Sequence, residues 1–404
     1  MTSVFSFAED LRGEGLATVL DRVQATGADS LTLAASYHQS RDVFPHNPHG
    51  VTQYLSSGSS AFRPTTERYG LLHPAPGDGR RDLLADLVDA TTARGMTAQA
   101  WVVLLHNSRL GRAHPEVTVH NALGDRLRHA LCPAHPEVRR YVTALATDLA
   151  EHGVTAIHLE ALTAGGYDHG ETHERALIYL GETARFLLGL CFCPHCRAAG
   201  HAQDVDVDVL AARIHGVLTE VLQSHDYAAA LPPLTPDTLG ELLGEPILAY
   251  LAARTRTVTT LAAEVATTVH AVSAQTRVVL LDPSGAALGY ATGRPETSAS
   301  ATSLAWREGL DLADLSEHVD IGALCYFADP DRMRQEIVTY SSTLRPGGRL
   351  AAVLRPTWPD ATSADTLSAN VRAARDAGVS DLHFYTYGLV RLESLDWLRR
   401  SLAI

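Results

Sequence analysis

The sequence contains no lysine, and all 33 of its basic residues are arginine. Enzymes that form a Schiff base through lysine, such as lysine-dependent aldolases and pyridoxal-phosphate enzymes, are therefore excluded. A Walker phosphate loop is excluded for the same reason. The chain also lacks a G-x-G-x-x-G dinucleotide loop and a G-x-S-x-G nucleophile elbow, so nothing supports a Rossmann cofactor site or a lipase-like triad.

Basic runs and long apolar runs are missing as well. The formal charge is −13, whereas nucleic-acid binding needs a basic face, so no nucleic-acid partner is expected. No apolar stretch reaches the length of about 18 residues that a membrane span requires. The N-terminal residues lack the basic and apolar segments of a signal peptide, and the five cysteines do not resemble a secreted disulfide framework. We therefore expect a cytoplasmic protein.

One pattern recurs along the 404 residues. An amphipathic helix ends at a glycine, and a β-rich run that ends in polar residues follows within a few positions. The glycines are Gly27, Gly95, Gly153 and Gly378, and glycine suits this place because a helix often closes in the left-handed conformation, which costs other residues about 1 kcal/mol. Such repeated helix–strand units predict a parallel sheet with right-handed connections.

The number of predicted strands indicates a single (β/α)8 barrel, the TIM barrel of the α/β class, over residues 1–404. The strands are Val4–Phe7, Leu31–Tyr37, Ala98–Leu105, Val154–Glu160, Arg277–Leu281, Asp320–Tyr326, Leu350–Leu354 and Leu382–Tyr387. An open doubly wound sheet is the alternative. Two long insertions are expected, a catalytic-face loop at 39–79 and, after the fourth strand, a helical subdomain at 161–275 that is also the candidate contact of a homo-oligomer.

Catalytic groups of such barrels cluster where the strands end. In the strand that ends at Glu160, apolar Ile157 and Leu159 alternate with His158 and Glu160, which places Glu160 on the barrel axis. A carboxylate is costly there unless it is paired or used, so Glu160 is the first catalytic candidate. The alternative is a structural pair with Arg355 or a histidine.

The second catalytic candidate is Asp282, which ends the next strand and precedes Pro283. Two facing carboxyl groups can hydrolyse a glycosidic bond as acid and base or as acid and nucleophile. Asp282 could equally be a turn or cap residue, and Asp329 is the reserve partner.

Sugars need aromatic faces for their C–H surfaces and polar groups for their hydroxyls. Side chains of both kinds stand at or just beyond the predicted strand ends, and we expect them to bind a small carbohydrate. They are His38, His106, Asn107, Tyr167, Tyr326, Asp329, Arg355, Tyr385 and Tyr387.

Three cysteines fall within six positions, at Cys191, Cys193 and Cys196, and Cys132 is a further candidate ligand. These four residues could hold a structural zinc ion. Reduced, partly buried thiols are the alternative. No other cofactor is expected.

Three segments resemble a group of uncharacterised actinobacterial proteins described as alanine-rich or glycoside-hydrolase-like. The segments are Pro45–Pro48, Leu105–Gly111, and Leu131–Arg139 leading into the Glu160 strand and the Cys191 cluster. The resemblance covers about half of the chain and implies a TIM barrel with a carbohydrate site. The strand that often ends in aspartate in broader glycosidase-like families ends here in Glu160.

Three functions remain open on the sequence. The first is a glycosidase that uses Glu160 and Asp282. The second is a metal-dependent sugar isomerase or epimerase with the same carboxylates and strand-end histidines as ligands. The third is a barrel that binds sugar without turning it over.

Overall fold

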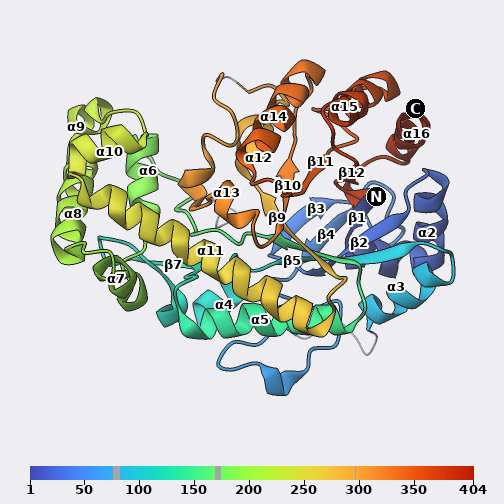
Figure 1. Cartoon of the computed structure of the whole chain (residues 1–404), viewed down its shortest axis with the longest axis horizontal. Coiled ribbons are helices and arrows are strands. Elements are labelled where there is room, and N and C mark those ends of the chain that lie inside the picture. Colours follow the sequence, from blue (N-terminus) through green and yellow to red (C-terminus); the bar gives the residue numbers. More distant parts are fainter. Residues whose placement is uncertain (76–81, 169–173, 296) are drawn as a thin grey trace.

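Eight parallel strands close into a barrel in the computed structural model, which describes residues 1–75, 82–168, 174–295 and 297–404 (Figure 1). The barrel order is β1–β2–β5–β8–β9–β10–β11–β12, closing on β1. The strands are β1 (Thr2–Ser6), β2 (Ser30–Ser36), β5 (Thr97–Val103), β8 (Ala156–Glu160), β9 (Arg277–Asp282), β10 (Asp320–Leu324), β11 (Leu350–Leu354) and β12 (Asp381–Phe384). All eight strands predicted from the sequence are therefore confirmed.

A helical layer surrounds the barrel. Its helices are α2 (Leu16–Ala25), α3 (Leu83–Thr92), α5 (Pro136–Glu151), α11 (Pro246–Val272), α13 (Leu312–Leu315), α14 (Pro330–Thr343), α15 (Ala364–Asp376) and α16 (Leu392–Leu402). The four glycines predicted to close helices all adopt positive φ, between 69° and 96°. Since left-handed backbone disfavours a Cβ, these glycines set where four of the strands begin.

Shorter elements fill the connections. The loop after β2 holds the hairpin β3 (Ser40–Val43) and β4 (Thr52–Leu55), and the loop after β5 holds α4 (Ser108–Ala113) and the hairpin β6 (Thr118–His120) and β7 (Arg126–Leu131). A short helix, α12 (Ser284–Gly289), follows β9. Residues 76–79 of the predicted 39–79 loop lie outside the described residues.

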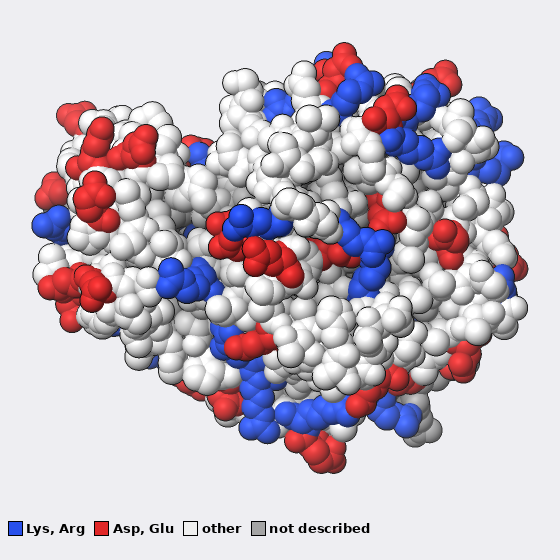
Figure 2. Space-filling view, in the orientation of Figure 1, with Lys and Arg blue, Asp and Glu red and all other residues white. Residues whose placement is uncertain are grey.

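The helical insertion after β8 has a hydrophobic core of its own. Its helices are α6 (Glu182–Gly189), α7 (Pro194–His201), α8 (Val207–Gln223), α9 (His225–Ala230) and α10 (Pro236–Leu243), which lie together at the left of Figure 1. Acidic side chains gather over this region (Figure 2).

Helix α11 belongs to both cores. Its first turns, with Ile247 and Tyr250, pack in the core of the insertion, whereas Val258, Leu261 and Val265 pack in the barrel core. The predicted insertion 161–275 therefore contains the fourth helix of the barrel itself. The apolar residues of α11 pack first against the insertion and then, further along the helix, against the barrel.

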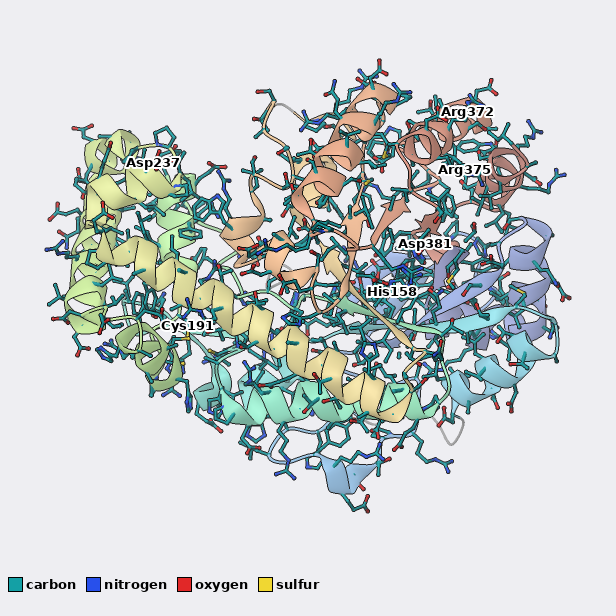
Figure 3. The ribbon with its side chains drawn as sticks, viewed as in Figure 1. His158, Cys191, Asp237, Arg372, Arg375 and Asp381 are labelled. Atoms are coloured by element: carbon teal, nitrogen blue, oxygen red, sulfur yellow. The ribbon has the colours of Figure 1, made fainter. Side chains whose placement is uncertain are left out.

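The barrel interior is polar below its mouth. Arg277 forms ion pairs with Asp320 and Asp381 at the bottom, at 2.7 and 2.6 Å. Nearer the mouth, His158 lies within hydrogen-bond distance of Gln99, at 2.7 Å, and its ring packs against that of His383. Figure 3 labels His158 and Asp381 within the barrel. Burial lowers the pKa of both imidazoles, that of His383 to about 4, so both are neutral at neutral pH.

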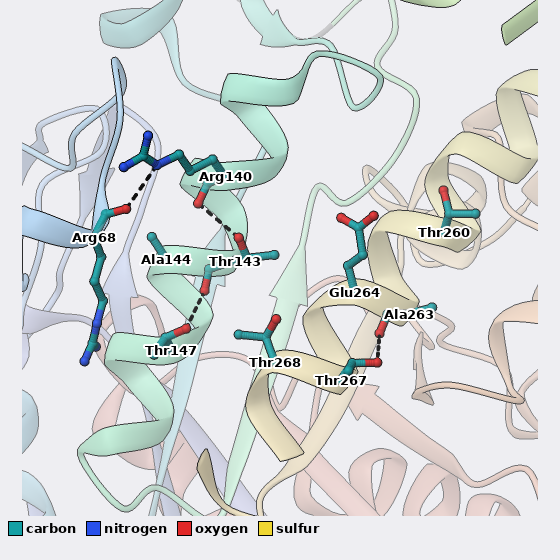
Figure 4. A pocket seen from close by; sticks show the side chains of 10 residues that line it. All are labelled: Arg68, Arg140, Thr143, Ala144, Thr147, Thr260, Ala263, Glu264, Thr267 and Thr268. Carbon is teal, nitrogen blue, oxygen red and sulfur yellow. Dashed lines mark hydrogen bonds between the residues drawn. The ribbon is translucent and has the colours of Figure 1, made fainter. Parts of the chain in front are cut away.

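A groove of about 760 Å³ lies outside the barrel, between α5 and α11 (Figure 4). Threonine and alanine line most of it, and its carboxylate, Glu264, is paired with Arg139 at 2.6 Å. Ligand sites of barrels form at the carboxyl ends of the strands, so the groove's position and neutralised charge make it a poor candidate. In the described part of the chain, no helix is long and apolar enough to cross a membrane.

Candidate active site

Glu160 ends β8 and points into the barrel mouth. Its neighbours Ile157 and Leu159 pack in the outer core, as the alternation predicts. The indole Nε1 of Trp101, on the adjacent strand β5, donates a hydrogen bond of 2.5 Å to the Glu160 carboxyl. No ion pair to Glu160 is found among the described residues, so its charge has no basic partner in the structure.

Burial raises the pKa of Glu160 to about 7, and the hydrogen bond from Trp101 opposes the shift only in part. The cause is loss of water rather than a second negative charge. The residue as a whole is not fully covered. A carboxyl group that holds its proton near neutral pH at the strand ends of a barrel is suited to general acid catalysis.

Three tyrosines surround this carboxyl. Tyr37 follows β2, Tyr326 follows β10 and Tyr385 follows β12. Burial raises the pKa of each hydroxyl, with a further contribution from the Glu160 charge. The hydroxyls of Tyr37 and Tyr385 are 3.4 Å apart. The tyrosines therefore remain neutral hydrogen-bonding groups. The Trp101 ring packs beneath them, with its centroid 4.7 Å from that of Tyr37 and 5.6 Å from that of Tyr385.

Asp42 provides a second carboxylate near these tyrosines. It lies on β3, where Ser40 donates a hydrogen bond of 2.5 Å to it, and its charge raises the pKa of both Tyr37 and Tyr385. Asp42 comes from the hairpin over the mouth rather than from a barrel strand. Sequence reasoning missed it because no strand-end rule applies to a residue in an inserted loop.

The two predicted histidines lie next to this group. The ring of His38 stacks on that of His106, with centroids 4.8 Å apart and planes 9° from parallel, and also contacts Tyr37 at 4.1 Å. The two stacked rings therefore extend the aromatic surface beside Tyr37. The structure thus brings His38 and His106 to the mouth.

Arg355 lies on the opposite side of the mouth and is neutralised. It makes two hydrogen bonds of 2.7 Å to Asp360, and its guanidinium carbon lies 4.2 Å from the centre of the Tyr326 ring. It also donates to the carbonyls of Gly289 and Tyr290. Arg355 therefore holds two loops and one tyrosine in place, and the alternative that it pairs with Glu160 is not what the structure shows.

We expect Asp360→Asn to destabilise the protein by about 3–5 kcal/mol, because it leaves the buried guanidinium of Arg355 without its partner charge. The free energy of unfolding in urea measures the change. Asp396→Asn is the matched control, since its pair with Arg399 is exposed and worth about 1 kcal/mol or less. Equal effects of the two variants would show that the Arg355 pair contributes no more than a surface pair.

Asp282 is not brought to Glu160, which corrects the predicted carboxyl pair. On β9, Val279 and Leu281 face the barrel interior, so Asp282 faces outward. There its carboxylate accepts a hydrogen bond of 2.6 Å from Tyr340 of α14 and further bonds from the backbone and hydroxyl of Ser284. The turn-residue alternative fits these contacts, because the regular alternation that turns Val279 and Leu281 inward turns Asp282 outward.

Four of the predicted binding residues lie in other environments. Asn107 caps α4 and Asp329 caps α14 through their side-chain oxygens. The hydroxyl of Tyr387 bonds with Arg22 and Glu14, away from Glu160, and Tyr167 packs between the insertion core and the cysteines. A polar residue at a strand end can thus serve the helix that follows it, which the sequence pattern does not distinguish.

The side chains of Cys132, Cys191, Cys193 and Cys196 converge, with their sulfurs within 4.8 Å of one another. Three sulfur pairs lie 3.4, 3.6 and 3.8 Å apart, close to the edge of about 3.8 Å that a tetrahedron with Zn–S bonds of about 2.3 Å would have. Among the described residues, this is the group of three or more His, Cys, Asp or Glu side chains placed to hold a metal ion. The site lies between the end of β7 and the start of α7.

Comparisons with solved structures identify the fold. The chain superposes on β-galactosidases from Marinomonas ef1 (TM-score 0.58, 12% identity) and Halorubrum lacusprofundi (0.56, 15%) and on α-L-fucosidase isoenzyme 2 from Paenibacillus thiaminolyticus (0.55, 12%). It has the fold of glycoside hydrolase barrels. The alignments cover 99–100% of this chain but only 48–58% of those proteins, so the chain spans about half of their length. No protein-family model and no curated protein sequence matches the chain.

Proposed function

We propose that the protein hydrolyses glycosidic bonds, with Glu160 as the general acid. The observation that carries the proposal is a protonatable carboxyl, without a basic partner, at the centre of an aromatic barrel mouth. The glycoside hydrolase fold agrees with it. Protonated Glu160 would donate its proton to the glycosidic oxygen, and a sugar would pack a C–H face on Tyr385, which is partly exposed.

Asp42 is the second carboxylate of the proposal. Its charge acts on the hydroxyls of Tyr37 and Tyr385 from the hairpin, while the Glu160 charge acts on the same two hydroxyls from the barrel. In this arrangement Asp42 would accept a proton from the attacking water, and the two hydroxyls would hold the sugar between the carboxylates. A water-activating carboxylate must stand apart from the acid to leave room for that water.

The test is hydrolysis of a panel of p-nitrophenyl glycosides, including β-galactosides and α-fucosides, by the wild-type protein and Asp42→Asn. We expect at least one substrate to be cleaved and Asp42→Asn to lower its kcat about 10²–10⁴-fold. Full activity of this variant would remove Asp42 from the mechanism and leave Glu160 as the lone carboxyl, as in substrate-assisted hydrolases. Cleavage of no member by the wild-type protein would contradict the proposal.

Sugar binding without turnover is the second candidate. One observation favours it: within the described residues, no barrel strand places a second carboxylate beside Glu160. At the end of β11 the structure has instead Arg355, whose charge is neutralised by Asp360. The isomerase alternative lacks such support, because in the described part of the chain no metal-ligand group forms at the mouth.

We further propose that the four cysteines hold a structural zinc ion. Four sulfur ligands form a closed tetrahedral site, which leaves no position for substrate, so the ion would act on stability and not on the reaction. It would join Cys132 of the barrel loop to Cys191, Cys193 and Cys196 of the insertion.

A further inference from the structure

Two large aromatic side chains are exposed on the Arg355 side of the mouth. Tyr290 is 65% exposed and Trp358 is 70% exposed, although rings of this size are usually covered. Tyr290 follows α12, and Trp358 lies in the loop after β11. Both loops stand at the carboxyl ends of barrel strands, on the face that carries Glu160.

The two loops are fastened to each other. Arg355 donates to the carbonyls of Gly289 and Tyr290 in one loop and to the carboxylate of Asp360 in the other. Gly293 lies so close that a Cβ there would be 2.9 Å from the Asp360 carboxylate. The exposed rings therefore stand on a rigid base, which lowers the entropy lost when a ligand binds.

A continuous series of rings connects this base to Glu160. Ring centres are 5.6 Å apart from Trp101 to Tyr385, 6.2 Å from Tyr385 to Tyr326 and 6.4 Å from Tyr326 to Tyr290. The series begins at the residue that hydrogen-bonds Glu160 and ends at the exposed Tyr290. Trp101 and Tyr326 are buried within this series, so the ring that it presents to a ligand beyond the carboxyl is that of Tyr290.

The charges on this path select a neutral ligand. The guanidinium of Arg355 lies over the rings of Tyr326 and Tyr290, at 4.2 and 5.3 Å, but its charge is neutralised by Asp360. An anionic ligand would therefore find no free cation among these residues, whereas apolar C–H faces can stack on the exposed ring of Tyr290.

We infer that Tyr290 and Trp358 form an outer sugar-binding platform, so that the substrate is a neutral oligosaccharide or polysaccharide longer than the unit bound at Glu160. The inference rests on the proposed glycosidase function for its reaction, but not for its binding. The platform would hold a sugar of the same chain, one or more units away from the bond that is cleaved.

Binding is measured separately from cleavage. Glu160→Gln, which is expected not to turn substrate over, is run in native affinity gels that contain soluble galactan, xylan, β-glucan or glycol chitin. We expect at least one polysaccharide to retard it and the added substitutions Tyr290→Ala or Trp358→Ala to weaken that retardation on the order of tenfold. Retardation by none of the polysaccharides, or retardation that both added substitutions leave unchanged, would overturn the inference.

Cleavage is measured with oligosaccharides of the retarding polysaccharide, from disaccharide to hexasaccharide. In the wild-type protein kcat/KM should rise with chain length, and Tyr290→Ala and Trp358→Ala should remove that rise. Tyr54→Ala is the control, because Tyr54 is 72% exposed but pairs with Arg41 on the face of the hairpin opposite Asp42. Its profile should match the wild type.

The outcomes separate the two proposals. Binding through Tyr290 and Trp358 without cleavage of any glycoside would support the platform and contradict the glycosidase. Cleavage whose chain-length profile is the same in the wild-type protein and both variants would support the glycosidase and overturn the platform.

Discussion

Glu160→Gln is expected to lower kcat about 10²–10⁴-fold while the protein stays folded. Glutamine has nearly the same shape and its oxygen can still accept the hydrogen bond from Trp101, so the substitution removes the transferable proton and little else. Initial rates on the best substrate of the glycoside panel measure the effect. Glu393→Gln, on the exposed surface of α16, is the matched control and should leave the rate unchanged.

The pH dependence follows from the pKa of about 7. Glu160 must be protonated to act as an acid, so kcat/KM should fall as pH rises through about 7, tenfold for each further pH unit. A rate that is flat from pH 6 to pH 9, or a Glu160→Gln variant with wild-type activity, would show that Glu160 is not the acid.

The stability of the folded protein should also fall as pH rises. The folded protein holds the Glu160 proton up to about pH 7, whereas the ordinary pKa is 4.5, so this group contributes stability that is lost as pH rises through that window. Glu160→Gln carries no charge at any pH and should therefore be more stable than the wild type at pH 8, by up to about 3 kcal/mol, and little different at pH 4. Thermal unfolding at the two pH values measures this difference, which a fully solvated carboxylate would not produce.

Removal of zinc is expected to have the second large effect. The four sulfurs lie together in a largely buried cluster between the barrel and the helical insertion. Zinc makes this arrangement favourable because thiolate bonding to the ion becomes part of the folding free energy. We expect about one zinc ion per chain by elemental analysis, and a drop of many degrees in the melting temperature after removal with a chelator.

Cys193→Ser tests the same site without a chelator and should lower both the zinc content and the melting temperature. Cys325→Ser is the control, since Cys325 is a buried cysteine that lies outside the cluster, and its zinc content should equal that of the wild type. A metal-free protein whose melting temperature the chelator does not change would rule out the structural ion. Catalysis by that same protein would leave the glycosidase proposal standing.

Side-chain periodicity explains why Glu160 could be found from the sequence and its partner could not. Alternation along β8 is regular, so the position of Glu160 on the barrel axis follows from Ile157 and Leu159 alone. On β9 the same alternation places Val279 and Leu281 inside the barrel, and it therefore turns the next residue, Asp282, outward. The alternation also predicts that Trp101 points into the barrel, because its position in the predicted strand is one of the inward-facing positions.

The residues brought by loops follow no such rule. Asp42 comes from a hairpin in the loop after β2, and Arg355 joins the loop that carries Tyr290 to the loop that carries Trp358. The four cysteines are an intermediate case, since three share one short segment but Cys132 joins them from a hairpin far away along the chain.

The sequence by itself determined the barrel, because strand and helix periods and the glycines between them are local properties of the chain. It also determined the excluded chemistries, since a missing lysine is missing in any fold. Only the tertiary structure decided which strand-end side chains share one space and which cap a helix. That choice depends on backbone direction at the strand ends and on contacts between segments far apart in the chain, which residue spacing does not encode.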